Sequence, residues 1–169
     1  MTNVFGIVGW SGSGKTDLTT RIINYFVKKD ILVASIKHTH HNFEVDKKGK
    51  DSNQHMKAGS NEVIIFNENK WALISKYQNE SVGIEKIIDK FEKKTEIILV
   101  EGLKHSSFPK IEVIRTNQKN PFIYKEDNNI KALVVDDESK EFYEDTLPVF
   151  KFSNTNLIGD FIWRFFNNE

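Results

Sequence analysis

The chain has 169 residues, 38% of them hydrophobic and 28% charged, a composition typical of a folded domain and not of a disordered or fibrous protein. Lysine plus arginine and aspartate plus glutamate both number 24, so no net charge draws the protein to nucleic acid or an anionic membrane, and we expect neither partner. Cysteine is absent, which excludes disulfides and cysteine-ligated metals.

Hydropathy predicts a cytoplasmic location. The longest apolar runs fall far short of the roughly 18 residues that a membrane helix needs. The opening apolar run, residues 4–8, is too short for the core of a signal peptide. We therefore expect a cytoplasmic protein without a membrane span.

The first elements along the chain form a β-α-β pattern. Residues 4–8 and 31–36 are short apolar runs typical of buried strands, and residues 16–29 have apolar side chains at helical spacing. This pattern predicts two parallel strands joined by a right-handed crossover.

The middle of the chain predicts short helices and a hairpin. A helix is expected over residues 51–58, closed by Gly59. Residues 62–66 and 71–77 predict two antiparallel strands joined by a tight turn. Apolar residues at helical spacing over 84–91 predict another helix.

The remaining residues alternate strand and helix patterns, which is typical of an α/β domain. Strands are expected at residues 96–100, 111–115, 130–135 and 149–152, and a final amphipathic helix has its apolar side over residues 157–165. The pattern does not define the order of the strands.

Residues 9–16 match the pattern G-x-x-x-x-G-K-S/T at every fixed position, between a predicted strand and a predicted helix. Glycines let backbone N–H groups turn inward around phosphate oxygens, and the helix adds its positive N-terminus. The Lys15 ammonium can reach the β- and γ-phosphates, and the Thr16 hydroxyl can bind Mg²⁺. We expect a bound purine nucleoside triphosphate with Mg²⁺, held by Gly9, Ser11, Gly12, Ser13, Gly14, Lys15, Thr16 and Asp17.

This P-loop refines the predicted fold. We expect a three-layer P-loop NTPase-like domain with a mainly parallel sheet and an antiparallel hairpin extension. Since no linker or repeat interrupts the chain, we expect one domain over residues 1–169.

Glu101 follows four apolar residues of a predicted strand and precedes a glycine, which is the position of a Walker B acid. It can bind Mg²⁺ through water or orient an attacking water, so Lys15 and Glu101 are the candidate catalytic residues. The alternative is a carboxylate that only caps the end of the strand.

Polar residues follow the second predicted strand, at the edge where parallel strands face a ligand crevice. We expect Lys37, His38 and Lys50 to contact a phosphate of the nucleotide or of a second ligand. Asp46 is a candidate Mg²⁺ ligand together with Thr16 and Glu101.

The histidines of this loop, His38, His40 and His41, also have a spacing that a transition-metal site could use. We favour the alternative of a solvated polar loop whose histidines make hydrogen bonds.

Recognition of the base has no clear pattern, since no Asn-Lys-x-Asp is present and residues 117–120 lack the final acid. Asp136 and Asp137 follow the predicted strand 130–135, where a carboxylate could accept from guanine, and Asp136 is the candidate. The alternative is that both are ordinary turn residues.

The sequence resembles the molybdopterin-guanine dinucleotide biosynthesis adapter proteins of the MobB type, closely over its first two-thirds. Just before the Gly49-Lys50-Asp51-Ser52 stretch this family often has a proline, and this chain has Lys48. The shared blocks are the P-loop, then Ile36-Lys37-His38 through Gly49-Lys50-Asp51-Ser52 with His55, Ala58 and Gly59, then Glu101-Gly102-Leu103-Lys104 and Pro109-Lys110-Ile111-Glu112-Val113.

The resemblance implies a homodimeric GTP-binding accessory protein with at most weak GTPase activity. It implies that the protein acts with the molybdopterin guanylyltransferase, which attaches GMP to molybdopterin, and that molybdopterin is a further candidate ligand. The preference for GTP over ATP rests on this resemblance. Because the sequence identifies neither a water-positioning residue nor an arginine finger, we expect turnover below about 1 s⁻¹.

Two other functions compete with this interpretation. An ATP-dependent small-molecule kinase of the same fold is the main alternative, but such kinases use mobile arginines, and Arg21, Arg115 and Arg164 lie in no evident lid. A ParA-like ATPase would have a further lysine early in the P-loop, where Trp10-Ser11 stands.

The predicted hairpin is a candidate surface for self-association. Its residues Trp71, Leu73 and Ile74 can extend a sheet across a two-fold axis. The alternative is that they cover the core of their own domain.

Overall fold

The computed structural model describes residues 3–39, 43–45, 49–77, 81–116, 118–139 and 147–167. The chain forms two compact units, the first from Met1–His38 with Phe91–Glu169 and the second from Thr39–Lys90. One domain over residues 1–169 therefore stays a prediction. In the described part of the chain, no helix is long and apolar enough to cross a membrane.

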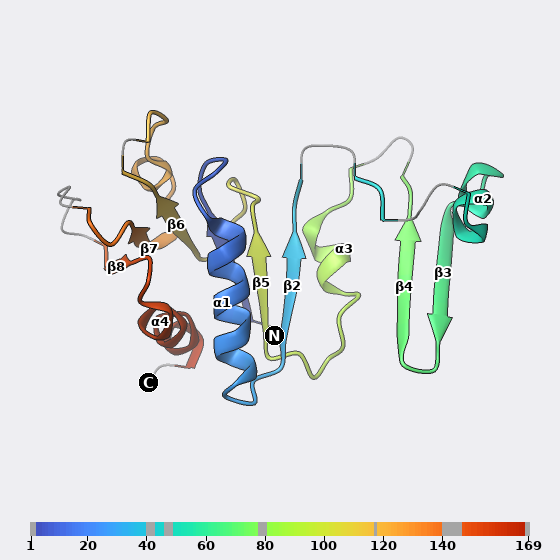
Figure 1. Ribbon diagram of the computed structural model, residues 1–169, viewed down its shortest axis with the longest axis horizontal. Helices are drawn as coiled ribbons and strands as arrows, with labels where there is room; N and C mark the ends of the chain where they lie inside the picture. The colour runs from blue at the N-terminus through green and yellow to red at the C-terminus, as the bar shows by residue number, and fades with distance from the viewer. Residues whose placement is uncertain are drawn as a thin grey trace. The chain divides into compact units, whose positions relative to one another are not determined.

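The first unit is built on a six-stranded sheet in the order β2-β5-β1-β6-β7-β8 (Figure 1). Every pair of neighbouring strands is parallel. Its strands are β1 (Asn3–Val8), β2 (Val33–Lys37), β5 (Ile97–Glu101), β6 (Lys110–Ile114), β7 (Ile130–Val135) and β8 (Val149–Lys151). Because all the strands run the same way, their carboxyl ends lie along one edge of the sheet.

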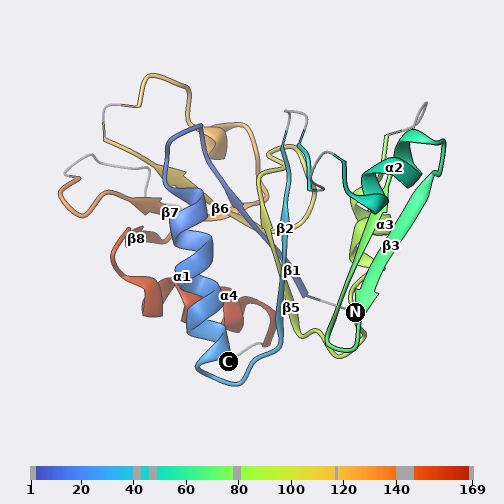
Figure 2. The same ribbon diagram turned by 45° about the vertical axis from the view of Figure 1, so that its right-hand side comes forward.

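Two helices, α1 (Lys15–Val27) and α4 (Thr155–Asn167), lie side by side on one face of this sheet (Figures 1 and 2). Aromatic side chains fill much of the core beneath them. The ring of Phe5 on β1 is fully buried and meets three phenylalanines of α4 edge-on, at centroid distances of 5.8 to 6.4 Å.

The opposite face of the sheet has a smaller apolar cluster and two buried ionisable side chains. The Lys110 ammonium lies 2.6 Å from the Asp127 carboxylate, and Glu112 accepts hydrogen bonds from the backbone N–H groups of Ile123 and Tyr124, over 3.0 and 2.8 Å. Lys110 and Glu112 are both fully buried. These contacts fasten the 3₁₀ turn η1 (Ile123–Lys125), which the sequence pattern does not predict.

The second unit contains α2 (Asp51–Lys57), β3 (Glu62–Asn67), β4 (Lys70–Ser75) and α3 (Ile84–Ile88). β3 and β4 form an antiparallel hairpin that is a sheet of its own. The carboxamide oxygen of Asn67 accepts from the N–H groups of Asn69 and Lys70, over 3.0 and 2.8 Å, and so closes the turn.

The predicted α/β fold is confirmed, with a mainly parallel sheet and an antiparallel hairpin. The helix predicted over residues 84–91 ends at Ile88, and the first helix, predicted to end at residue 29, ends at Val27. Asp30 adopts a left-handed φ of 57°, and the Ile31 N–H bonds to Phe26 O over 3.1 Å. This six-to-one hydrogen bond ends the helix early and delays the next strand to Val33.

Candidate nucleotide-binding site

The P-loop connects β1 to α1 at the carboxyl edge of the sheet. Gly12 and Gly14 have φ values of 78° and 89°, in the left-handed region that favours glycine. Gly14 is the N-cap of α1 and has no side chain to cap the first N–H groups of the helix. These donors and the helix dipole therefore face the place where the pattern predicts phosphates.

The interior of the loop leaves one donor unsatisfied. Ser13 is buried, and its hydroxyl has no hydrogen-bond partner among the described residues. A Cβ on Gly9 would lie 2.7 Å from this oxygen, so the loop has no room for a larger residue there. Since buried polar groups are normally hydrogen-bonded, the geometry fits an oxyanion such as a phosphate in this loop.

Two of the predicted magnesium ligands, Thr16 and Glu101, meet at the mouth of the P-loop. Thr16 donates its hydroxyl hydrogen to Glu101 Oε1 over 2.7 Å. The ammonium of Lys37 donates to both oxygens, at 3.1 Å from Thr16 Oγ1 and 2.9 Å from Glu101 Oε1. Glu101 is only 8% exposed, so its charge is little screened by solvent. The ammonium lies between two oxygen ligands of the kind that Mg²⁺ prefers, and these residues could hold that ion.

The sheet register produces this arrangement. Glu101 is the last residue of β5 and is paired with Ile7 on one side and Lys37 on the other. The backbone N–H of His38 extends the pairing by bonding to Glu101 O over 2.9 Å. The structure therefore brings Thr16, Lys37 and Glu101 together at this edge, and their binding roles stay predictions.

The Lys15 ammonium donates to Trp10 O across the P-loop, over 2.7 Å. Burial lowers the pKa of Lys15; the charge of Glu101 opposes this shift, and the charges of Lys104 and Lys37 add to it. A bound polyphosphate would favour the ammonium form, which is the form that phosphate binding needs.

Trp10 links the P-loop to two further loops, and the sequence does not predict this role. Its indole N–H donates to Pro121 O over 2.9 Å, and the Lys104 ammonium lies 3.2 Å from the centroid of its ring. Burial lowers the pKa of Lys104, and the Glu112 carboxylate opposes this shift. Side-chain contacts of this kind leave no periodic signal in a sequence.

Arg115 is a site residue that the pattern analysis missed. Its Nε donates to Ser13 O over 2.8 Å, its guanidinium pairs with Asp136, and it lies 4.0 Å from the Phe152 ring centroid. Phe152 in turn stands against Gly14, where a Cβ would lie 2.9 Å from Cζ of that ring. The available signal was that Arg115 ends a predicted strand at the edge that carries the P-loop.

Asp136, the predicted base-reading residue, lies beside this arginine. One carboxylate oxygen pairs with Arg115, and the other accepts from the Thr116 N–H over 2.7 Å. Burial alone would raise the pKa of Asp136, but these hydrogen bonds hold it below its ordinary value. A role in base recognition stays a prediction.

The other predicted residues are more scattered. Asp17 accepts from Arg21 Nε over 3.0 Å within α1, and Lys50 is the N-cap of α2 in the second unit. Asp46, His40 and His41 lie outside the described residues. Within the ranges described, no three histidine or acidic side chains form a group that could hold a metal.

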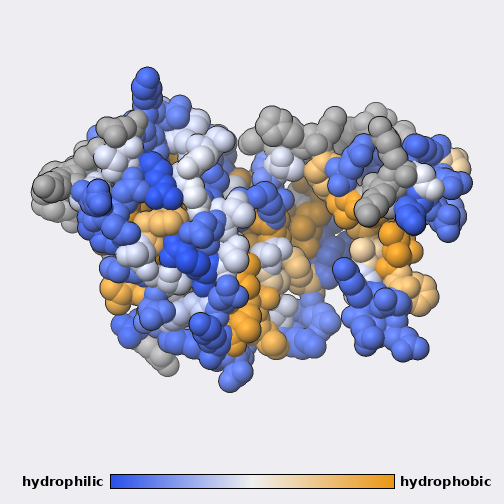
Figure 3. Space-filling view, in the orientation of Figure 1, coloured by the Kyte–Doolittle hydropathy of each residue, from blue (hydrophilic) through white to orange (hydrophobic). Residues whose placement is uncertain are grey.

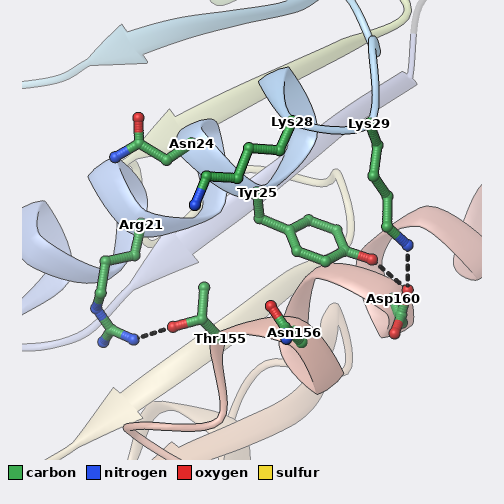
Figure 4. Close-up of a pocket in the computed structure, with 8 residues that line it drawn as sticks. All are labelled: Arg21, Asn24, Tyr25, Lys28, Lys29, Thr155, Asn156 and Asp160. Carbon is green, nitrogen blue, oxygen red and sulfur yellow. Dashed lines mark hydrogen bonds and ion pairs between the residues drawn. The ribbon is translucent and has the colours of Figure 1, made fainter.

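A groove of about 540 Å³ lies between α1 and α4 (Figure 4). Tyr25 and Lys29 both donate to Asp160 across it, and Arg21 bonds to Thr155. The hydrogen bonds and the Lys29–Asp160 ion pair thus cross the groove from one helix to the other, which is typical of a seam between packed helices and not of a nucleotide site.

A family model described as MobB, molybdopterin guanine dinucleotide synthesis protein B, matches residues 4–136. The chain is 40% identical over 119 residues to a molybdopterin-guanine dinucleotide biosynthesis adapter protein of Haemophilus influenzae, covering 70% of this chain and 66% of that one. It is 36% identical over 117 residues to the protein of that name in Escherichia coli, covering 68% and 67%. The chain thus spans about two-thirds of the length of these relatives.

Solved structures are similar over nearly the whole chain. Bacillus subtilis MobB superposes with a TM-score of 0.75 at 19% identity, covering 95% of this chain and 96% of that one. The Bacillus stearothermophilus MobB homolog superposes with a TM-score of 0.74 at 17% identity, covering 99% and 100%. At such identities the similarity establishes the fold.

Proposed function

The chain belongs to the MobB family, the family of molybdopterin guanine dinucleotide synthesis protein B, and we propose that it is a GTP- and Mg²⁺-binding adapter acting with a molybdopterin guanylyltransferase. This membership confirms the resemblance in the sequence and does not favour the kinase alternative. The curated relatives are named adapter proteins of molybdopterin-guanine dinucleotide biosynthesis.

The proposal depends most on the Thr16–Glu101–Lys37 cluster at the mouth of the P-loop, where hydroxyl, carboxylate and ammonium lie within 3.1 Å of one another. Lys15 and the backbone N–H groups of residues 9–16 would bind the β- and γ-phosphates. Thr16 and Glu101 would hold the Mg²⁺, which neutralises phosphate charge.

Calorimetric titration of the purified chain with GTP and with ATP, each with Mg²⁺, tests nucleotide binding. Lys15→Ala should weaken triphosphate binding at least tenfold, or about 1.4 kcal/mol. Lys28→Ala, which removes an exposed lysine just after α1, should leave affinity unchanged. Unchanged affinity in Lys15→Ala would refute the assignment.

The adapter role predicts that nucleotidyl transfer occurs in the partner enzyme. The isolated chain should hydrolyse GTP more slowly than about 1 s⁻¹, and its addition to guanylyltransferase and molybdopterin should increase formation of the guanine dinucleotide. Equal product formation with and without the chain would contradict the adapter role.

We also propose a homodimer formed through the hairpin. Cross-strand pairs Ile64–Leu73 and Phe66–Trp71 share one of its faces, and Ile64, Phe66 and Trp71 are 60%, 79% and 58% exposed. Figure 3 shows apolar surface over this part of the molecule. An exposed apolar face of this kind favours a protein contact, and a solution mass of one chain only would exclude the dimer.

A further inference from the structure

We propose that Asp137, positioned by Ser153, is the carboxylate that reads the guanine base; this inference rests on the proposed binding of GTP. Asp137 follows β7, and Ser153 follows the neighbouring strand β8, both at the carboxyl edge of the sheet. The sequence pattern places both Asp136 and Asp137 where a carboxylate could accept from guanine, and Asp136 is the residue selected there.

Strand order places Asp137 at a suitable distance from the phosphates. β7 is two strands from β1 in the order β1-β6-β7, which is roughly 10 Å along the edge of the sheet. Ligands of open parallel sheets bind at the carboxyl ends of the strands, so a nucleotide whose phosphates lie in the P-loop can extend along this edge to β7. Ser153 is next to Phe152, whose ring stands against Gly14, so the Asp137 loop adjoins that flank of the P-loop.

The carboxylate is fixed through one oxygen. Both the backbone N–H and the hydroxyl of Ser153 donate to Asp137 Oδ1, over 3.0 and 2.8 Å. No described residue donates to Oδ2, and the side chain lies in an exposed position. These hydrogen bonds lower the pKa of Asp137, so the group is an ionised acceptor at neutral pH.

This chemistry suits guanine and not adenine. Guanine presents two donors on one edge, N1–H and the exocyclic 2-amine, and an ionised carboxylate can accept from both. Adenine presents an acceptor at N1 and has no 2-amine, so the lone pair on its N1 would be repelled by the negative charge of the carboxylate. Sites built around such hydrogen bonds reject analogues that lack the donors.

The other acids at this edge are less suited to the role. Both oxygens of Asp136 are bonded, to Arg115 and to the Thr116 N–H. Asp136 therefore fixes the arginine that braces Ser13 of the P-loop. Asp137 combines a fixed orientation with an oxygen that faces no described donor.

The test compares GTP, ATP and xanthosine triphosphate binding, with Mg²⁺, to the wild-type chain and to Asp137→Asn. An asparagine amide offers one donor and one acceptor, which matches the 2-oxo group and N1–H of xanthine. GTP affinity should fall at least tenfold, and xanthosine triphosphate affinity should rise by a similar factor. Glu138→Gln, an exposed acid next in the chain, should change neither.

Ser153→Ala is the second variant and makes the test independent of how well Asp137→Asn folds. It keeps the carboxylate but removes one of its two anchors, so it should reduce the preference for GTP over ATP without abolishing triphosphate binding. Wild-type selectivity for GTP that survives in both variants would overturn the role of Asp137. A wild-type chain that binds no triphosphate would instead overturn the proposed function.

Discussion

Lys37 and Glu101 are paired in register at the carboxyl ends of β2 and β5, with the Lys37 ammonium 2.9 Å from Glu101 Oε1. The same ammonium also reaches the hydroxyl of Thr16. A lysine charge therefore occupies a position between the two oxygens that would bind Mg²⁺, and the two cations would compete for it.

Replacement of Lys37 by methionine should test this competition between the Lys37 ammonium and Mg²⁺. Without the ammonium, we expect the Mg²⁺ concentration that half-maximally promotes triphosphate binding to fall about threefold to tenfold, because no competing cation remains. Triphosphate affinity without Mg²⁺ should fall, because one positive charge is lost. Nucleotide titrations over a range of Mg²⁺ concentrations measure both, with Lys28→Met as the matched control; a higher Mg²⁺ requirement would contradict the competition.

Glu101→Gln should give the opposite result. The amide oxygen can still accept from Thr16 and Lys37, but the negative charge that attracts Mg²⁺ is gone. We expect Mg²⁺ to promote triphosphate binding about 10- to 100-fold less effectively, the range found when groups that orient metal ligands are altered. Glu96→Gln is the control. Glu96 lies just before β5, and its carboxylate accepts a hydrogen bond from the backbone N–H of Leu32. Equal Mg²⁺ dependence in the two variants would exclude Glu101 from the metal site.

Local sequence patterns define the elements of this fold better than their arrangement. Short β-branched runs and the glycine-lysine loop were enough to place β1, α1 and Glu101. The strand order was not encoded locally, so the position of β6 beside β1, which brings Arg115 to Ser13, could not be derived. The η1 turn depends on a buried carboxylate 11 residues away, Glu112, and had no signal in its own segment.

Arg115→Lys should destabilise the P-loop although the variant retains the positive charge. A lysine cannot bond Ser13 O and Asp136 together while stacking on Phe152, because it lacks the planar fork of a guanidinium. We expect a loss of about 1–3 kcal/mol in unfolding free energy, together with weaker triphosphate binding. Arg164→Lys, in the last turn of α4, is the control. Chemical denaturation and calorimetry measure the two effects; wild-type values for both would show that the brace is dispensable.

The affinity for polyphosphate should fall at alkaline pH, because Lys15 loses its proton there. Burial lowers the pKa of this lysine in the free chain, and a bound polyphosphate would raise it. Between these two pKa values binding takes up a proton, so affinity should fall as pH rises through that interval. Inorganic tripolyphosphate is the ligand for this measurement above about pH 8, because it has no nucleobase that would change its own protonation there. Lys15→Arg stays protonated there and should flatten the profile; an equally steep profile in that variant would assign the effect to another group.

Glu112 should make the fold more stable on mild acidification. Burial raises its pKa, while hydrogen bonds from Ile123 and Tyr124 and the charge of Lys104 oppose the shift without reversing it. The folded chain therefore holds a proton that the unfolded chain, with a glutamate pKa of about 4.3, releases. The contribution of Glu112 to the unfolding free energy falls as pH rises through the interval between the unfolded and folded pKa values, and it is constant above that interval.

Glu112→Gln isolates this contribution, since acids with lowered pKa, such as Asp127 and Asp136, act equally in both proteins. The variant should be less stable at neutral pH by about 1–3 kcal/mol, because its amide N–H₂ would face a backbone donor. The difference between wild type and variant, from urea denaturation at successive pH values, should grow on acidification. A difference that shrinks on acidification would mean that the hydrogen bonds to Ile123 and Tyr124 outweigh burial, and that Glu112 is held as a carboxylate.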